Sequence, residues 1–397
     1  MANNKKILTC DVAVVGAGLV GLAAVIALAE QGKRVALIDA QQKAVKQKVQ
    51  KTQEFDARIY AITPSTEAFL KRLGVWAFVD LSRVNDVEAM ALWSADEEQS
   101  LRLLAEDANL SKMACIAEND NLMQALWQKV EALDVSVLMG APCRTIHYDH
   151  DVVVLDLENG SQICASLLVA ADGAHSFVRQ QLAIATKTKA FNQTALVANY
   201  RIEKAHGNIA RQWFGAHETL AFLPLSLKQI SIVWAVEAEL AQALLNLTDE
   251  ALAEQVQIRS NNVLGELKPA SQTFSFALKQ VTANQLIADR VVLIGDAAHQ
   301  VHPMAGEGAN LGFRDVIGLE SLIAGAHVMQ DIGEFSFLRR YERARISDIL
   351  GMNILTTGLD SLFAFESTAI KNIANFGMQQ LDKHPGMKNI LIQQAIA

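Results

Sequence analysis

Residues 291–315 read VVLIGDAAHQVHPMAGEGANLGFRD, a pattern that predicts a strand, a loop and a helix in succession. Its apolar, β-branched beginning predicts a buried strand, and the residues from about Ala309 onward predict an amphipathic helix. Between the two lie an acidic turn, Gly295-Asp296, and a glycine loop. Backbone amides at the start of a helix attract negative charge and polar oxygens. We therefore expect a nest for a polar ligand here, in which Asp296 accepts hydrogen bonds from ligand hydroxyls.

The loop admits two other interpretations: an ordinary strand–loop–helix joint, or a metal site built on His299 and His302. No third cluster of metal ligands follows the two histidines, and we expect no metal. Three glycines within fourteen residues instead favour a backbone that a ligand approaches closely. The loop residues of the expected nest are Pro303, Gly306 and Gly308.

Composition sets the bounds on the class of protein. A chain of 397 residues, 51% hydrophobic and 20% charged, can bury a large core and divides into two interleaved domains. The net charge of −8 argues against a nucleic-acid partner. The four cysteines show no CxxC spacing and no signal peptide precedes them, so we expect a reducing cytoplasm. No apolar run is long enough to span a bilayer, and any membrane contact is expected to be peripheral.

A second motif lies at residues 11–39. A buried strand, the sequence GAGLVG, an amphipathic helix and a second strand ending in Asp39 form a dinucleotide fingerprint with its full context. The glycines of this fingerprint, Gly16, Gly18 and Gly21, permit a tight turn, close approach of a pyrophosphate and close helix–strand contact. The carboxylate of Asp39 suits the hydroxyl pair of an unphosphorylated ribose, as in FAD or NAD.

The third motif is the acidic turn Asp172-Gly173, which ends a buried strand and opens a helix. This helix carries Arg179, which suits a second phosphate contact. Arg58 lies in the loop after the second strand and could reach a pyrophosphate, although a surface salt bridge explains it equally well. A dehydrogenase that binds only NAD completes its site within one contiguous fold. Three separated motifs at strand ends therefore favour a larger ligand, such as FAD.

The rest of the chain predicts an α/β fold with an inserted sheet. We expect strands at 84–93 and 100–104, a helix at 118–133, a helix capped by Ser65 or Thr66, and an antiparallel excursion of short strands before residue 167. From 194 to 278, β-rich runs predict a mostly antiparallel sheet with helices near 238–246 and 249–259. Its aromatic residues, Trp213, Phe214, Phe222 and Trp234, together with Leu223, form either plain core or a wall over an aromatic substrate.

This pattern divides the chain into a discontinuous Rossmann-like domain that carries the GxGxxG fingerprint, a substrate domain and a helical C-terminus. The expected FAD-binding domain comprises 1–80, 105–185 and 280–335. The expected substrate domain comprises 81–104 and 186–279, and the C-terminal helical region is 336–397. The apolar C-terminal helices, from Asp360 onward, either complete the core or dock on a membrane surface or a partner.

The three motifs together resemble those of the single-component flavin monooxygenases that are similar to para-hydroxybenzoate hydroxylase. Within that class the chain is similar to the ubiquinone-biosynthesis hydroxylases. DARIYAIT around Arg58, the helix start at Glu118-Asn119, YERAR at 341–345 and the C-terminal tail support this, so the resemblance runs nearly end to end. Position 307 is Glu where that family usually has Gln, and position 39 is Asp where Glu is commoner.

The resemblance implies a cofactor site for extended FAD. Gly16 to Gly21 would bind the pyrophosphate, Asp39 the adenosine ribose and Asp296 the ribitol, with the Pro303 and Gly306 loop beside the flavin ring. The complete expected set is Gly16, Ala17, Gly18, Leu19, Val20, Gly21, Asp39, Arg58, Asn119, Asp172, Gly173, Gly295, Asp296, Pro303, Gly306, Gly308, Ala309 and Asn310.

The resemblance also implies the reaction. NADH or NADPH would reduce the flavin, O2 would give a flavin C4a-hydroperoxide, and an electron-rich polyprenyl phenol of ubiquinone biosynthesis would be hydroxylated. The cofactor carries this chemistry while the protein supplies a dry, orienting cavity. The phenol-activating base, the ring position, the tail length and the oligomeric state are not identified. We expect a cytoplasmic protein, with peripheral contact at the inner membrane surface or a biosynthetic protein assembly as alternatives.

Two further hypotheses stay open at this stage. The first is an FAD-dependent monooxygenase or reductase that acts on another aromatic or isoprenoid substrate. The halogenases of this broad fold usually carry a W-x-W-x-I-P segment and a lysine, which are not found here. The second is an assembly subunit that retains the flavin fold without catalysis.

Overall fold

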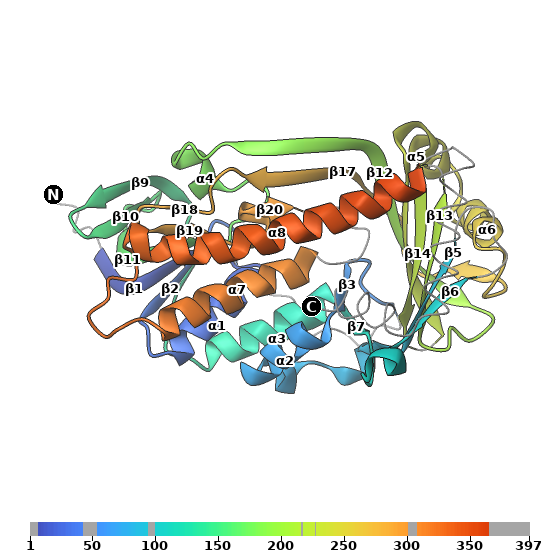
Figure 1. The fold of residues 1–397 in the computed structure, drawn as a ribbon, viewed down its shortest axis with the longest axis horizontal. Helices are drawn as coiled ribbons and strands as arrows, with labels where there is room; N and C mark the ends of the chain where they lie inside the picture. Colours follow the sequence, from blue (N-terminus) through green and yellow to red (C-terminus); the bar gives the residue numbers. More distant parts are fainter. Residues whose placement is uncertain are drawn as a thin grey trace.

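The computed structural model describes residues 7–42, 54–93, 100–215, 217–226, 228–300 and 308–364. The parallel sheet lies towards one end of the long axis of the molecule, strands β5, β6, β13 and β14 of the second large sheet lie towards the other end, and helices pack beside the parallel sheet (Figure 1). The expected α/β class is confirmed. Among the helices that the structure describes, none has the length and hydropathy needed to cross a membrane.

A parallel sheet forms the first half of the molecule. Its strands are apolar on both faces, as expected of parallel strands that helices or other strands cover. Their order is β19-β11-β1-β2-β8, and each neighbouring pair is parallel. The strands are β1 (Ile7–Val15), β2 (Val35–Asp39), β8 (Ser136–Met139), β11 (Gln162–Ala170) and β19 (Val291–Leu293).

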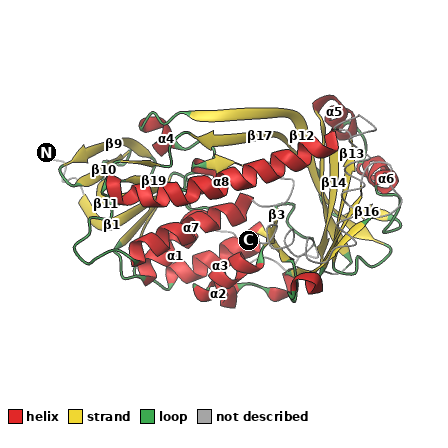
Figure 2. Ribbon diagram, viewed as in Figure 1, coloured by secondary structure: helices red, strands yellow, loops and turns green. Residues whose placement is uncertain are grey.

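Helices lie beside this sheet (Figure 2). Helix α1 has nine buried residues, because it is sandwiched between the sheet and two other helices, α3 and α7. The long helix α8 packs along α7. The helices are α1 (Leu19–Glu30), α2 (Pro64–Arg72), α3 (Asn119–Glu131), α7 (Gly308–Ala324) and α8 (Phe335–Ala364).

Two local expectations are corrected here. Helix α2 is capped by the hydroxyl of Thr63, which accepts from Thr66 N, rather than by Ser65 or Thr66. The segment at 136–139 is not part of the antiparallel excursion, because β8 pairs in parallel with β2. The excursion itself is β9 (Cys143–Asp149) and β10 (Val152–Leu157), which lead back antiparallel into β11.

Short elements connect the two halves of the molecule. Strands β3 (Ile59–Ile62), β7 (Ala114–Glu118) and β4 (Asn85–Val87) form a three-stranded sheet. The hairpin strand β18 (Ile287–Ala288) joins the edge of the parallel sheet beside β19. Helix α4 (Phe177–Gln181) follows β11.

The second large sheet is mostly antiparallel, as expected from residues 194–278. Helices α5 (Ala238–Leu245) and α6 (Asp249–Arg259) occur where they were expected. The sheet contains β5 (Ala89–Trp93), β6 (Leu101–Leu104), β12 (Thr186–Ile202), β13 (Ile209–Gly215), β14 (Glu218–Leu225), β15 (Gln229–Glu237), β16 (Leu267–Pro269), β17 (Phe274–Ala283) and β20 (His299–Gln300). Only the β5–β13 pair is parallel among the pairs described for this sheet.

The two faces of this sheet carry side chains of different size. Trp213, Phe222 and Trp234 belong to the core cluster that packs with α5 and α6, so their interpretation as a substrate wall is wrong. Phe214 is also buried, and Leu223 alone of the five lines the central cavity.

The C-terminal segment from 365 lies outside the described residues, as do the side chains from 352, so the docking hypothesis for this region stays a prediction.

Candidate active site

A cavity of about 1380 Å³ lies between the carboxyl ends of the parallel strands and the inner face of the second sheet. This is the crevice where open α/β sheets bind ligands. Its volume exceeds the roughly 300–1,000 Å³ of a site for one small ligand, so it has room for a cofactor and a second molecule. The expected residues on its wall are Gly16, Ala17, Gly18, Leu19, Val20, Asp39, Arg58, Asn119, Asp172, Gly173, Gly295, Asp296, Gly308 and Ala309.

Four expected residues are not placed on this wall. Gly21 and Asn310 are described but do not line the cavity. Asn310 is buried, accepts from Thr63 N at 3.1 Å and donates to Ala61 O at 2.8 Å, and so ties the start of α7 to the β3–α2 junction. Pro303 and Gly306 lie outside the described residues.

The three glycines of the first motif have three different surroundings. Gly16 has a φ of +110°, and a Cβ there would lie 2.2 Å from Ala171 O. A Cβ on Gly21 would lie 2.0 Å from Gly16 O, so this glycine allows α1 to pack against the end of β1. A Cβ on Gly18 would meet nothing within 4 Å, although the residue lines the cavity. Gly18 therefore borders open space at the start of α1.

Asp39 lies at the end of β2 beside this turn. Its Oδ2 accepts from Ala17 N at 2.6 Å and its Oδ1 accepts from Gln41 N at 2.7 Å. The carboxylate thus fixes the glycine turn while it lines the cavity.

The Gly295-Asp296 turn rests on a buried ionic cluster. Asp315 on α7 accepts from Gly295 N at 2.8 Å and from His299 Nε2 at 2.7 Å through Oδ2, and from Arg345 Nε at 2.7 Å through Oδ1. Burial alone would raise the pKa of Asp315, but His299 and Arg345 outweigh it and hold the pKa below its ordinary value. His299 is therefore engaged in a hydrogen bond with Asp315, and His302 lies outside the described residues.

Helix α8 completes this support. Arg345 pairs with Asp315, and the Tyr341 hydroxyl donates to Leu293 O at 3.3 Å. The side chain of Glu342 accepts from Leu286 N at 3.0 Å. The YERAR segment thus holds the strand that delivers Asp296 to the cavity. Asp296 itself is exposed and accepts only from Gln300 Nε2, at 3.3 Å, among the hydrogen bonds described for it.

Arg58 and Tyr60 line the cavity from β3 and the loop before it. The Arg58 guanidinium lies over the Tyr60 ring, with Cζ 5.8 Å from the ring centroid. Burial raises the pKa of Tyr60, while the Arg58 charge opposes the rise and Asp296 adds to it. A cation, a phenol and a carboxylate therefore meet on one part of the wall.

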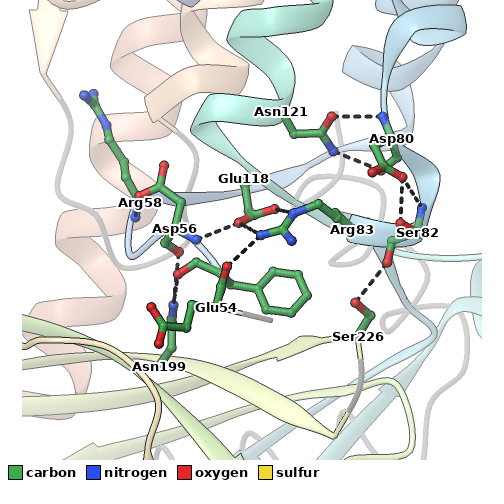
Figure 3. A network of polar contacts seen from close by, with 11 residues as sticks. Glu54, Asp56, Arg58, Asp80, Ser82, Arg83, Glu118, Asn121, Asn199 and Ser226 are labelled. Carbon is green, nitrogen blue, oxygen red and sulfur yellow. Dashed lines mark hydrogen bonds and ion pairs between the residues drawn. The ribbon is translucent and has the colours of Figure 1, made fainter. Parts of the chain in front are cut away.

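A buried clamp holds the segment that leads to Arg58 (Figure 3). Glu118 at the end of β7 accepts from Asp56 N at 2.6 Å and from Arg83 Nε at 2.5 Å. Arg83 Nη2 also donates to Glu54 O at 2.9 Å. The guanidinium of Arg83 lies over the ring of Phe55, with Cζ 4.6 Å from the ring centroid. Asn199 of β12 donates to the carbonyl oxygens of residues 55 and 56. The clamp therefore joins the three-stranded sheet and the second large sheet to one short segment.

The third motif lies at the end of β11. Asp172 Oδ2 accepts from Val178 N at 3.1 Å, while its buried Oδ1 has no hydrogen-bond partner among the described residues. Burial raises the pKa of Asp172. The expected phosphate role of Arg179 is not supported, because its guanidinium is buried and donates to Ala297 O at 2.8 Å and to Ala174 O at 2.7 Å.

Small side chains form the wall of the cavity on the second sheet. They alternate along β14 and β15 with the large residues of the outer core, as strand geometry requires. The sequence AFLPL around Phe222 and the sequence IVWAV around Trp234 carry this alternation, which sequence reasoning missed. The cavity residues of β12, β13, β14 and β15 are Val197, Ala210, Arg211, Gln212, Thr219, Ala221, Leu223, Val233 and Ala235.

Two further functional residues were missed. Asp315 is a charged side chain on the buried face of α7, a pattern that signals a buried partner. Gly312, one turn beyond the nest, allows α7 to approach α1, since a Cβ there would lie 2.5 Å from a Val20 methyl group.

Comparison with known proteins identifies related chains. Residues 9–348 match the family model of the FAD binding domain. The ubiquinone hydroxylase UbiL of Rhodospirillum rubrum is 31% identical over 97% of this chain and 89% of its own length. The 3-demethoxyubiquinol 3-hydroxylase of Escherichia coli is 30% identical over 97% of this chain and 98% of its own. The solved structure of p-nitrophenol 4-monooxygenase PnpA from Pseudomonas putida has the same fold, with a TM-score of 0.79 over 99% of both chains at 17% identity.

Proposed function

This chain belongs to the FAD binding domain family and is an FAD-dependent monooxygenase, and from that premise we propose that it hydroxylates the aromatic ring of a polyprenylated phenol in ubiquinone biosynthesis. NAD(P)H is the reductant and O2 the oxygen donor typical of this class of enzyme. The relatives that match nearly the whole chain are named for ubiquinone hydroxylation, and this similarity supports the choice of substrate.

The residues at the strand ends fit FAD. The open space beside Gly18 is a cradle that a Cβ would occupy, at the start of a twelve-residue helix whose first turn contains no acidic residue. The partial positive charge of that helix start favours a pyrophosphate. Asp39 and Asp296 are carboxylates at two other strand ends, where ribose and ribitol hydroxyls would donate to them.

We assign the following roles to the chain's own residues. Gly16 to Leu19 would hold the pyrophosphate, Arg58 would add a cation to it, and the start of α7 at Gly308 would lie near the flavin ring. When bound, FAD accepts reducing equivalents from NAD(P)H and activates O2 for transfer of one oxygen atom to the substrate ring. The Asp315 cluster would keep Asp296 in place without contacting the cofactor.

The small residues on the second sheet would receive the substrate. Valine and alanine side chains leave a flat, apolar wall opposite the strand ends, and such a wall excludes water from the reacting ring. Within this proposal the substrate domain is 81–104 and 186–279. The FAD-binding domain is the discontinuous set 1–80, 105–185 and 280–335, followed by the helical region 336–397. A lipid-soluble substrate would also bring the protein into peripheral contact with a membrane or with other enzymes of the same pathway.

A deletion strain tests the biological role. We expect cells that lack this chain to lose ubiquinone and to accumulate a prenylated ring precursor that lacks one hydroxyl group, measured by mass spectrometry. The wild-type chain should restore ubiquinone and Gly18→Val should not. Normal ubiquinone in the deletion strain, in the absence of a second hydroxylase, would rule out the proposed substrate. Restoration by Gly18→Val would point instead to a subunit that does not need its flavin.

A further inference from the structure

Two phenyl rings are exposed at the rim of the cavity. Phe274 and Phe276 on β17 both line the cavity, yet their exposed fractions are 53% and 47%. Residues two apart on a strand point to the same face, so the rings lie side by side. Single exposed apolar residues are common on protein surfaces, but two neighbouring rings that also line a cavity present apolar surface to a ligand in it.

The rings stand at an open edge of the second sheet. At Phe274 and Phe276, β17 pairs with β12 on one side, and its pairing with β20 involves only Val281 and Thr282. No other strand of the described chain pairs with β17. Two exposed residues of the cavity wall therefore lie at this edge of the sheet.

An apolar row connects the rings to the interior of the cavity. Strand register places five cavity residues directly opposite one another across the sheet, and four of the five are apolar. The row is Phe274, Val197, Val233, Ala221 and Gln212. A neighbouring row joins Phe276 to Ala235 and Thr219, which line the cavity, through the fully buried Ala195, which does not line it. The inner members are small, so a narrow molecule can lie along the rows.

We propose that these rows form the exit lane of the polyprenyl tail, with Phe274 and Phe276 holding the tail where it leaves the protein. This inference rests on the proposed function. A prenyl chain has no hydrogen-bonding groups, so it requires apolar contacts along its whole path through the protein. The lane provides such contacts from the small-residue wall to the surface. A tail longer than the lane would continue past the rings into lipid, which would allow the ring to be hydroxylated while its tail stays in the membrane.

Tail-length dependence tests the lane. The holoenzyme would be assayed with one phenol that carries a chain of several isoprene units and with the same phenol without the chain, both in detergent micelles. We expect wild-type kcat/KM to be at least about ten-fold higher with the chain. The double variant Phe274→Ser and Phe276→Ser should lose most of that ratio, and the leucine pair Phe274→Leu and Phe276→Leu should retain it. Ile258→Ser is the matched control, because Ile258 on α6 is 70% exposed but does not line the cavity.

The outcomes separate the lane from the function on which it rests. Hydroxylation of both phenols with equal kcat/KM, or an unchanged ratio in the serine pair, would overturn the lane while the hydroxylase activity stands. Loss of a dimer in the serine pair, measured by light scattering, would show that the rings cover a second copy of the chain and would also overturn it. If wild-type protein hydroxylates neither phenol, the proposed function itself fails.

Discussion

Gly16, Gly18 and Gly21 satisfy one motif for three separate physical reasons. Position 16 requires glycine because its φ is positive, and position 21 requires glycine because a Cβ would clash with Gly16 O. Neither reason applies at Gly18. At φ −78° and ψ −179°, the backbone of Gly18 suits a β-branched residue. The space beside Gly18 therefore serves a ligand rather than the fold.

We expect Gly18→Val to leave the free energy of unfolding nearly unchanged and to abolish FAD binding, because its methyl groups fill the cradle. The measurement is flavin absorbance of the purified variant together with its denaturant midpoint. Gly351→Val is the control, since a Cβ at this position on α8 also meets open space but far along the chain from the motif. Full flavin occupancy in folded Gly18→Val would refute the assignment of this loop.

Asp296 is expected to act on the cofactor and not on stability. Its carboxylate is exposed and has one weak hydrogen bond among those described. Replacement by Ala should weaken FAD binding by about 1.5–3 kcal/mol, the range for a lost charge-assisted hydrogen bond. Titration of the apoprotein with FAD measures this change. An unchanged Kd would make Asp296 a turn residue only.

Asp315 behaves in the opposite way, because it is buried and touches no cavity space. Its pKa is lower in the folded than in the unfolded chain, where it has the ordinary carboxyl value. The ionised carboxylate therefore contributes stability that is complete above the unfolded pKa and is lost as pH falls through the folded pKa.

We expect Asp315→Asn to lose roughly 3 kcal/mol of unfolding free energy at neutral pH, because Arg345 keeps a buried charge without its main partner. Urea unfolding measured from neutral to acid pH should show this difference shrinking as the wild-type carboxylate becomes protonated. A difference that is constant with pH would mean that the Asp315 carboxylate is not the source of the stability.

The clamp at residues 54–58 is a property of several elements together. Glu118 comes from β7, Arg83 from the short helix before β4, and Asn199 from β12. The clamp fixes the backbone that carries Arg58, since Asn119 N also donates to Arg58 O at 2.9 Å. Glu118 is thus a positioning residue for the Arg58 guanidinium.

We expect Glu118→Gln to weaken FAD binding on the order of ten-fold in the wild-type background and not at all when Arg58→Ala is already present. A double-mutant cycle on the FAD Kd measures this coupling. The control is Asp331→Asn, which removes an ion pair to Arg290, the residue just before β19. This variant should not change the Kd for FAD. Additive effects of Glu118 and Arg58 would show that the clamp supports the fold only.

The sequence predicted helices whose apolar residues recur periodically. It did not predict strand pairing that depends on contacts between distant parts of the chain. The helix at 118–133 occurs as expected, because its apolar residues recur at helical spacing. The two helices after β15 also occur where they were expected. Parallel pairing of β8 with β2 could not be read locally, because short apolar strands look alike in either sheet. Arg179 was assigned to a phosphate because nothing in the sequence shows that two carbonyl oxygens surround it.

At the scale of the whole molecule, the site exists because five parallel strands end at one edge and a second sheet faces that edge (Figure 1). The glycine turn after β1, the aspartate that ends β2 and the acid–glycine turns after β11 and β19 were visible in the sequence, so most of the cofactor wall could be predicted. The opposite wall could not, because small residues such as Ala221 and Ala235 carry no chemical signature until the register aligns them.

The central claim is that this cavity transfers one oxygen atom from O2 to an aromatic ring. The most direct measurement uses the purified, flavin-containing protein, NAD(P)H, a prenylated phenol and isotopically labelled O2, with the product analysed by mass spectrometry. We expect one labelled oxygen atom in the ring for each NAD(P)H consumed. Consumption of NAD(P)H that yields only hydrogen peroxide, or a hydroxylated product that carries oxygen from water, would contradict the account.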